Sequence, residues 1–243
     1  MNKYFLLLSV YAIFIFTFSM NLTKALFSDQ TVSANNTFTA ADVFPTPTPI
    51  PGIADHIVIS EVQINSGIAG NDFIEIYNPT SSIVNLSNIR LVKRATPATS
   101  SANIVVFSSS DNIQPRQYIL WATSDNGYNT AIGADYTSGD NISTNDSIAL
   151  IQGNKDTGTI IDAVAWGTGH SSSLFTENTP IANPANGGSI ERKALSTSDS
   201  TSMSAGGSDE EKGNGYDTNN NSNDFILRSI SQPQNSTSSS ESP

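Results

Sequence analysis

The sequence predicts an all-β fold, either a sandwich or a barrel. Short runs of β-branched and aromatic residues recur along the chain, and clusters of Gly, Asn and Pro separate them. No segment combines the 3.6-residue apolar periodicity and the caps of an amphipathic helix. Many short strands divided by turns are typical of antiparallel sheets.

The best-defined strand is the run 73–77, with the sequence Phe-Ile-Glu-Ile-Tyr. Alternation places Glu75 and its two aromatic neighbours on one face of the strand, and the two isoleucines on the other. Apolar groups on both faces indicate a strand inside a sheet. The run ends at Asn78-Pro79, because proline has no N–H for the ladder.

Further strands are expected on both sides of this run. They are rich in Val, Ile, Leu and aromatic residues, and turn residues stand between them. Asn88 interrupts the third run as a bulge or a turn, and residues 153–158 form a hairpin connection. The expected strands are 57–64, 73–77, 84–92, 103–107, 118–122, 147–151, 159–166, 189–192 and 225–228.

Residues 1–25 are predicted to be a signal peptide that is cleaved after Ala25. An apolar run follows Lys3, and small residues precede the cleavage position. The alternative is an uncleaved anchor, because the run extended to Leu22 approaches the ~20 residues that cross a bilayer. Contact with a membrane is expected only through this segment, if it stays uncleaved.

Two segments connect it to the folded domain. Residues 26–44 are a polar leader, and residues 45–52 are a Pro/Thr-rich linker. Alternating prolines favour an extended polyproline II form, so the linker is expected to act as a semi-rigid stalk. The sandwich is expected over residues 53–235. Its residues 194–223 carry few apolar side chains and predict a disordered insertion, and residues 236–243 predict a disordered tail.

The chain of 243 residues has a net charge of −11 and no cysteine. An acidic domain repels phosphate backbones, so we expect no nucleic-acid partner. The lack of cysteine removes disulfides, thiolate zinc sites and cysteine nucleophiles together. Because extracellular β domains of vertebrates often carry disulfides, this composition favours a bacterial origin.

A set of motifs in fixed order resembles the lamin tail domain family, in its exported bacterial form. Residues 59–62, 73–79 and 84–89 resemble its opening, and residues 160–167, 188–193, 223–225 and 233–235 resemble its later and closing motifs. The resemblance runs from about residue 55 to 235 and implies an immunoglobulin-like β-sandwich. It also implies a binding or scaffolding module, of a kind often attached to enzymes.

The segment after the apolar run carries a second resemblance. Residues 25–29 (Ala-Leu-Phe-Ser-Asp) and 36–40 (Asn-Thr-Phe-Thr-Ala) resemble the start of mature camelysin/TasA-type proteins. These are exported bacterial matrix and fibre proteins that a specialised signal peptidase processes. The resemblance covers about the first 45 residues and implies an export route, not a fold.

Glu61 and Glu75 lie on two strands that we expect to be neighbours. Two close carboxylates suit acid–base chemistry or cation binding. The alternative is that both point to solvent or bond to backbone groups at a sandwich edge. The resemblance favours this alternative, because the pair recurs in non-enzymatic modules of the family. We therefore predict no catalytic residue and no bound cofactor.

The segment 217–224 offers the candidate metal ligands of the chain. Acidic and amide oxygens at alternate positions suit calcium. The segment lacks the turn glycine of an EF-hand loop, and Arg228 stands where a closing glutamate is needed. The alternative is an Asx-rich turn before the strand that starts at Phe225. The calcium candidates are Asp217, Asn219, Asn221 and Asp224.

The two histidines and two tryptophans give little support to other sites. His56 and His170 are far apart in sequence and have no motif around them, so a histidine-based metal site or triad is not predicted. Trp121 and Trp166 are expected to anchor the core. Their alternative role, a stacking platform for sugars, requires them to be exposed and coplanar.

We therefore expect a non-catalytic, exported binding or structural module at the bacterial cell surface or in the extracellular matrix. Its partner is expected to be a protein or a surface polymer, bound by sheet edges and loops. One alternative is an accessory module of a calcium-dependent hydrolase or nuclease system. Another is a small hydrolase that uses Glu61 and Glu75.

Overall fold

The computed structural model describes residues 51–64, 70–96, 98–168 and 175–243. The predicted signal peptide or anchor, the leader, nearly all of the linker, the camelysin/TasA-like segment and His170 lie outside these residues. The fold described here belongs to the compact unit Thr48–Pro243. Among its described helices, none has the length and apolar character needed to cross a membrane.

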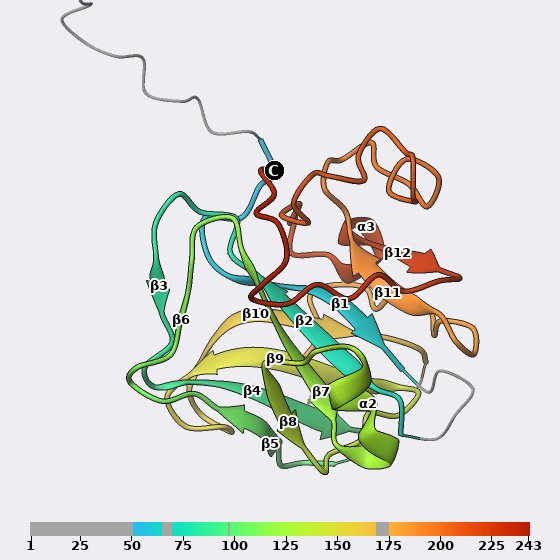
Figure 1. Ribbon diagram of the computed structural model, residues 1–243. Coiled ribbons are helices and arrows are strands. Elements are labelled where there is room, and N and C mark those ends of the chain that lie inside the picture. Colours follow the sequence, from blue (N-terminus) through green and yellow to red (C-terminus); the bar gives the residue numbers. More distant parts are fainter. Residues whose placement is uncertain (1–50, 65–69, 97, 169–174) are drawn as a thin grey trace, which may run out of the picture. The chain divides into compact units, whose positions relative to one another are not determined.

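The larger sheet has six strands, and Figure 1 shows β1 and β2 at its centre. Its neighbours pair antiparallel, except for β7 and β8, which run parallel. In spatial order the strands are β12 (Phe225–Arg228), β11 (Ser189–Arg192), β1 (Val58–Gln63), β2 (Phe73–Tyr77), β7 (Tyr118–Thr123) and β8 (Tyr136–Ser138).

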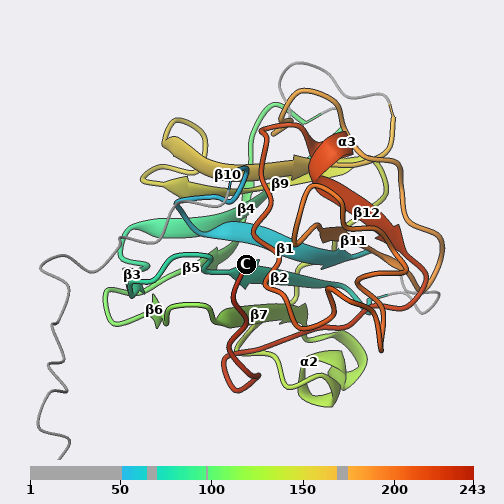
Figure 2. The same cartoon turned by 90° about the horizontal axis from the view of Figure 1, so that it is seen from above.

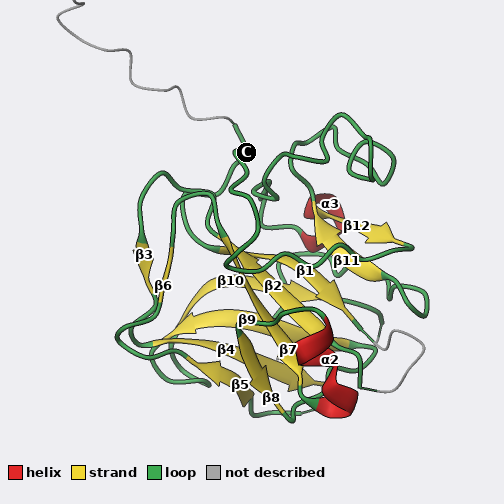
Figure 3. Cartoon of the chain, viewed as in Figure 1, coloured by secondary structure: helices red, strands yellow, loops and turns green. Residues whose placement is uncertain are grey.

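The smaller sheet has four antiparallel strands, which form the second layer in Figure 2. In order they are β10 (Thr159–Ala165), β9 (Asp146–Gln152), β4 (Ile89–Ala95) and β5 (Ala102–Val106). A separate ribbon pairs β3 (Val84–Asn85) with β6 (Asn112–Ile113). The helices are single turns between strands (Figure 3): η1 (Asp125–Gly127), α2 (Tyr128–Ala131) and α3 (Asn221–Asp224).

The main core lies between the two sheets, as expected for an immunoglobulin-like β-sandwich. Ile74 and Ile76 of β2 point into it, whereas Phe73 and Tyr77 join separate clusters on the outer face. This confirms the faces that alternation predicted for the run 73–77. Both tryptophans are buried core residues, so their predicted role as anchors is confirmed and neither offers an exposed ring to a sugar.

The third expected strand is two strands. Asn88 has a φ of 61°, and the chain turns there between β3 and β4. The two strands then enter different sheets, since β3 pairs with β6 and β4 joins the four-stranded sheet. Asparagine tolerates the left-handed backbone region better than most residues, which is why the break falls at this position.

Residues 194–223, which composition predicts to be a disordered insertion, form a series of hydrogen-bonded turns in the structure. Side-chain oxygens accept backbone N–H groups within the turns. The Ser198 hydroxyl accepts the N–H of Leu195 at 3.0 Å, and the Asp199 carboxylate accepts the N–H of Ser202 at 2.8 Å. Met203 is buried within this segment. The difference from the prediction arises because Ser and Asp side chains replace apolar packing as the source of local contacts.

The last residues also differ from the disordered tail that composition predicts. The Tyr118 hydroxyl donates to the Glu241 carboxylate at 2.7 Å, and the Glu241 N–H donates to the carbonyl of Arg116 at 2.9 Å. Residues 236–243 therefore lie against the six-stranded sheet. The physical reason is that the sheet presents polar groups to them on its outer face.

Candidate functional site

Three glutamates, here called the glutamate row, lie side by side in the six-stranded sheet. Glu61 of β1 stands directly opposite Glu75 of β2 on one side and Glu191 of β11 on the other. All three are buried, and β1 and β2 are central strands. The expectation that Glu61 and Glu75 point to solvent or lie at a sandwich edge is therefore wrong. Both strands are central, and the C-terminal segment covers the outer face on which the two glutamates lie.

Hydrogen bonds from other parts of the chain cover the carboxylates of Glu61 and Glu75. The Gln234 N–H donates to Glu75 at 2.5 Å, and the Ser60 hydroxyl donates to the same carboxylate at 2.6 Å. Glu61 accepts the N–H of Gln232 at 3.2 Å. The expectation that backbone groups bind these two carboxylates is thus confirmed, and the donors come from the C-terminal segment.

Glu191 has a different environment. It forms an ion pair with Arg228 of β12 at 2.5 Å and accepts a hydrogen bond from the Asn214 amide at 3.1 Å. The Arg228 guanidinium also donates to the carbonyl of Met203 at 2.9 Å, which ties the loop after β11 to β12. This end of the row therefore holds the only positive charge that is paired with one of the three glutamates in the described residues.

Burial raises the pKa of all three carboxyl groups. The pKa of Glu61 rises from 4.5 to about 8, because of burial and then because of the charge of Glu191. Burial and then the charge of Glu61 raise the pKa of Glu75 well above 4.5. The pKa of Glu191 rises to about 7 through burial, although Arg228 opposes the shift. The row therefore retains protons near neutral pH that exposed glutamates have lost.

Glu61 and Glu75 have the residue types of a paired-carboxylate active site, but neither has an opening for a substrate. Acid–base chemistry requires the carboxyl group to reach a reacting atom at hydrogen-bond distance. Glu61 and Glu75 instead face the chain's own N–H groups and hydroxyls, with almost no exposed surface. This geometry supports a structural role for the pair.

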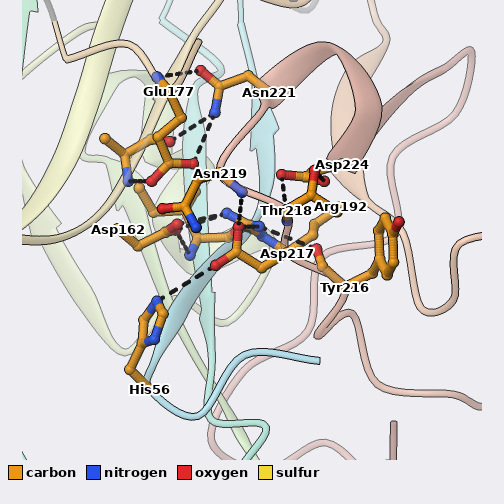
Figure 4. A network of polar contacts seen from close by, with 12 residues as sticks. His56, Asp162, Glu177, Arg192, Tyr216, Asp217, Thr218, Asn219, Asn221 and Asp224 are labelled. Carbon is orange, nitrogen blue, oxygen red and sulfur yellow. Dashed lines mark hydrogen bonds and ion pairs between the residues drawn. The ribbon is translucent and has the colours of Figure 1, made fainter. Parts of the chain in front are cut away.

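A second buried network joins the two sheets and is drawn in Figure 4. Arg192 of β11 binds Asp162 of β10 with one nitrogen, at 2.7 and 2.9 Å from the two carboxylate oxygens. Neither side chain has any exposed surface. Arg192 also donates to the carbonyl of Ile59 at 2.8 Å, and Asp162 accepts the Ile59 N–H at 2.6 Å. The pair thus fastens β10 to β1 and β11.

Figure 4 also shows His56 beside this pair. One ligand atom each from His56, Asp162 and Asp217 lies within 4.8 Å of the others, which is a spacing that suits a metal ion. However, the Arg192 guanidinium binds both aspartates, at 2.7 Å for Asp162 and 3.3 Å for Asp217. A cationic group of the protein thus already stands between the two carboxylates. The closeness of His56 to the two aspartates was not predicted from the sequence, because His56 is 161 positions from Asp217.

Two of the four calcium candidates precede α3 and two belong to it, and the four do not share one centre. Asp224 accepts hydrogen bonds from the N–H of Thr218 and of Asn220, both at 3.0 Å. Asn219 has a φ of 54°, and its N–H donates to Asp217 at 3.0 Å. These are the contacts of an Asx-rich turn that leads into β12.

Asn221 is turned away from the other candidates. Its side-chain oxygen accepts the N–H of Ala165 at 3.1 Å and of Glu177 at 3.2 Å, and its amide donates to Ala163 at 2.9 Å. The side chain therefore ties α3 to the end of β10. Its oxygen is already used by two donors, so it is poorly placed to bind an ion at the same time.

Glu177, and not the predicted candidate Asn221, lies close to Asp217 and Asp224. Carboxylate oxygens of Glu177, Asp217 and Asp224 lie within 4.8 Å of one another. Burial, followed by the charge of Asp162, raises the pKa of Glu177 to about 8. Glu177 could not be predicted from the sequence, because it stands in a polar connection with no periodic pattern. Glu191 was detectable in principle, since it is a lone carboxylate within an expected strand.

Residues 53–168 match the model of the Lamin Tail Domain family. This part of the chain is similar to a lamin tail domain. The match ends after β10, so β11, β12 and the C-terminal segment of this sandwich lie beyond it. Glu61, Glu75 and Asp162 are within the matched region, and Glu191 and Arg192 are outside it.

Comparison with solved structures finds a DUF4876 family protein from Bacteroides thetaiotaomicron VPI-5482. It is 13% identical in sequence, the similarity covers 77% of this chain and 74% of that chain, and the TM-score is 0.47. No curated protein matches the chain.

A cavity of about 450 Å³ opens beside Glu191, at one end of the glutamate row. Glu191 and Asn214 line it from the main part of the domain. Gln232, Gln234 and Glu241 line it from the C-terminal segment. The remaining lining comes mainly from the charged loop 209–212. The cavity is therefore polar, and the C-terminal segment forms one of its walls.

Proposed function

We propose that this domain is a non-catalytic binding or structural module that is exported to the bacterial cell surface or extracellular matrix, where it binds a protein or a surface polymer. One observation carries the proposal. Among the strands of the two sheets that the structure describes, three of the four edge strands expose an apolar side chain. These are Val106 of β5, Ile160 of β10 and Leu227 of β12, at 55%, 49% and 44% exposure.

Edge strands have unpaired backbone N–H and C=O groups that can take up a further strand. An added strand forms main-chain hydrogen bonds, and apolar side chains at the edge then contribute contact area and selectivity. Charged residues commonly protect such edges in proteins that stay apart. The exposed apolar side chains on β5, β10 and β12 therefore support a binding role for the sheet edges.

The non-catalytic part of the proposal rests on the burial of Glu61 and Glu75, which offer no open face to a substrate. The exported part rests on residues 1–25 and on the segments after them that resemble exported bacterial proteins. Both parts agree with an acidic domain that has no cysteine.

Capture of surface material tests the binding role. The immobilised mature chain is incubated with the extracellular protein and polymer fraction of its source bacterium, and the bound material is compared between wild type and Leu227→Ser. We expect Leu227→Ser to reduce capture, whereas Ile83→Ser, which changes a 60% exposed apolar residue outside the two sheets, leaves it unchanged. Equal loss from both variants contradicts recognition by the edge.

The enzyme alternative is tested with the same material. A hydrolase that uses Glu61 and Glu75 releases soluble fragments from the polymer fraction and stops doing so in Glu61→Gln. We expect no release of fragments from wild type or from Glu61→Gln. Fragment release that the substitution abolishes overturns the non-catalytic proposal.

The close approach of Glu177, Asp217 and Asp224 is the specific observation for the second candidate function, an accessory module of a calcium-dependent hydrolase or nuclease system. That function predicts that a chelator abolishes capture and that added calcium restores it. Capture that is insensitive to the chelator favours the edge-binding module.

A further inference from the structure

The C-terminal segment crosses the outer face of the six-stranded sheet. We call residues 229–243 the tail, the dark red trace that leaves β12 in Figure 1 and passes β1 and β2. Its hydrogen bonds follow the same route. The Ser231 hydroxyl donates to Gln63 of β1 at 2.5 Å, the Gln234 N–H donates to Glu75 of β2, and the Gln117 amide before β7 donates to the carbonyl of Ser238 at 2.8 Å.

Polar contacts rather than apolar packing hold the tail. None of its side chains is fully buried, and Ile230, its one large apolar residue, is mostly exposed. The rest is almost entirely Ser, Gln, Asn and Thr, a composition that does not fold on its own. Because little apolar surface leaves water when the tail binds, its removal costs less than the removal of a core strand.

The surface beneath the tail combines the buried rings of Tyr77 and Tyr118 with hydrogen-bonding groups. Glu61 and Glu75 present carboxylates from adjacent strands, and they receive the N–H groups of Gln232 and Gln234. An extended chain directs the N–H groups of alternate residues to the same side, so this pair of acceptors recognises the main chain of an extended segment.

Glu241 is the anchor of the tail. Its carboxylate accepts the Tyr118 hydroxyl at 2.7 Å and the Gln234 amide at 2.6 Å. Its carbonyl accepts the Tyr77 hydroxyl, and its N–H donates to Arg116 at 2.9 Å. The side chain and both backbone groups of one residue are thus bound at once, and hydrogen bonds to a charged group are the stronger kind.

The tail does not fill the space available to it. The cavity of about 450 Å³ lies directly beside Gln232, Gln234 and Glu241. Glu191 and Asn214 line the same space from the body of the domain. A segment with larger side chains than those of the tail therefore has room along this wall.

We propose that the surface beneath the tail is a recognition groove for an extended, glutamate-containing segment of a partner protein, and that the tail is a resident ligand which the partner replaces. This rests on the proposed function, because it names the class of partner for a binding module. Tyr118 selects the glutamate side chain, and Tyr77, Glu61 and Glu75 bind the main chain.

Exchange of the tail tests the proposal. A protease site is inserted between Ser229 and Ile230, both exposed, and the full chain is folded before it is cut. A fluorescent peptide of residues 230–243 is then titrated, and binding is followed by anisotropy. We expect saturable binding, and we expect the Glu241→Ala peptide to bind at least about tenfold more weakly, because hydrogen bonds to its carboxylate are lost. The Ser240→Ala peptide is the matched control and binds like wild type.

A substitution in the groove identifies the contact. Tyr118→Phe is expected to weaken the wild-type peptide by about tenfold and to leave the Glu241→Ala peptide unchanged, since both changes remove the same hydrogen bond. Absence of peptide binding in a cut chain that keeps its circular dichroism spectrum overturns the proposal. Equal affinities of the wild-type and Glu241→Ala peptides overturn it too.

A second variant covers the case in which the cut chain unfolds. Lys212 and Ser242 are bridge partners, and the chain has no cysteine, so Lys212→Cys with Ser242→Cys locks the tail by one disulfide. The oxidised chain is expected to exclude the peptide, and the reduced chain to bind it. Equal binding in both states contradicts the proposal. If capture through the β12 edge persists while the peptide fails, only the groove is refuted and the proposed function stands.

Discussion

Glu61 and Glu75 stand directly opposite each other on the two central strands of the larger sheet, and each accepts a backbone N–H from the C-terminal tail. Like charges at opposite positions of a sheet repel each other, and burial strengthens that repulsion. The domain avoids the repulsion by retaining protons on the row. The stability of the sheet therefore depends on pH.

We predict that the free energy of unfolding falls as pH rises from about 4.5 to about 8. The folded pKa values of Glu61 and Glu191 are raised to about 8 and about 7 from 4.5, so the folded state binds protons more tightly than the unfolded state. Their stabilising contribution is complete below pH 4.5 and is lost as pH rises through the folded values. The slope is about 1.4 kcal/mol per pH unit for each such group.

Urea unfolding at pH 5, 7 and 9 measures this dependence. Glu61→Gln removes one titrating group, so it is expected to flatten the profile and to be more stable than wild type at pH 9. Glu211→Gln changes an exposed carboxylate and is the control. A wild-type profile that rises steadily towards pH 9 contradicts the prediction.

We predict that Arg192→Leu destabilises the domain by about 3–5 kcal/mol, because it leaves Asp162 buried and without its ionic partner. The double variant Arg192→Leu with Asp162→Leu is expected to recover most of this loss, since no buried charge remains. Denaturant midpoints give both values. Lys155→Ala, at a partly exposed ion pair, is expected to shift the midpoint little. A single variant as stable as wild type refutes the role of Arg192 as the link between the sheets.

The main strands of this sandwich could be predicted from the sequence because the patterns that indicate them are local. Alternation within the run 73–77 placed Glu75 opposite the core, and the turn-rich connection before it made β1 and β2 neighbours. The predicted bounds of β2, β11 and β12 are those of the structure. In contrast, β6 and β8 have two and three residues, which is too short for a period to be recognised.

The environment of the row could not be predicted in the same way. Gln234 bonds to Glu75 across 159 positions of sequence, from a segment whose composition indicates disorder. The same is true of Asn221, whose amide binds β10 across 58 positions. Such contacts depend on where tertiary folding brings a polar segment, and no hydrophobic pattern encodes that.

We predict that calcium binds to the turn before β12 too weakly to stabilise the domain. Arg192 already neutralises Asp217, and the oxygen of Asn221 is used by two backbone donors. Calorimetric titration of the full chain is expected to show no saturable heat, and the melting temperature should not rise with calcium. A rise that Asp224→Asn abolishes contradicts this and restores the calcium-dependent alternative.

We predict that Asn88→Ala costs about 1 kcal/mol, whereas Asn88→Gly is close to neutral. The φ of 61° at Asn88 lies in the left-handed region, where alanine is strained and glycine is not. Ser87→Ala, at the exposed neighbouring position, is the control for a change at the same turn. Urea midpoints rank the three variants. If Asn88→Ala and Ser87→Ala prove equally stable, backbone strain does not fix this break. The entry of β3 and β4 into different sheets must then depend on packing around Ile89.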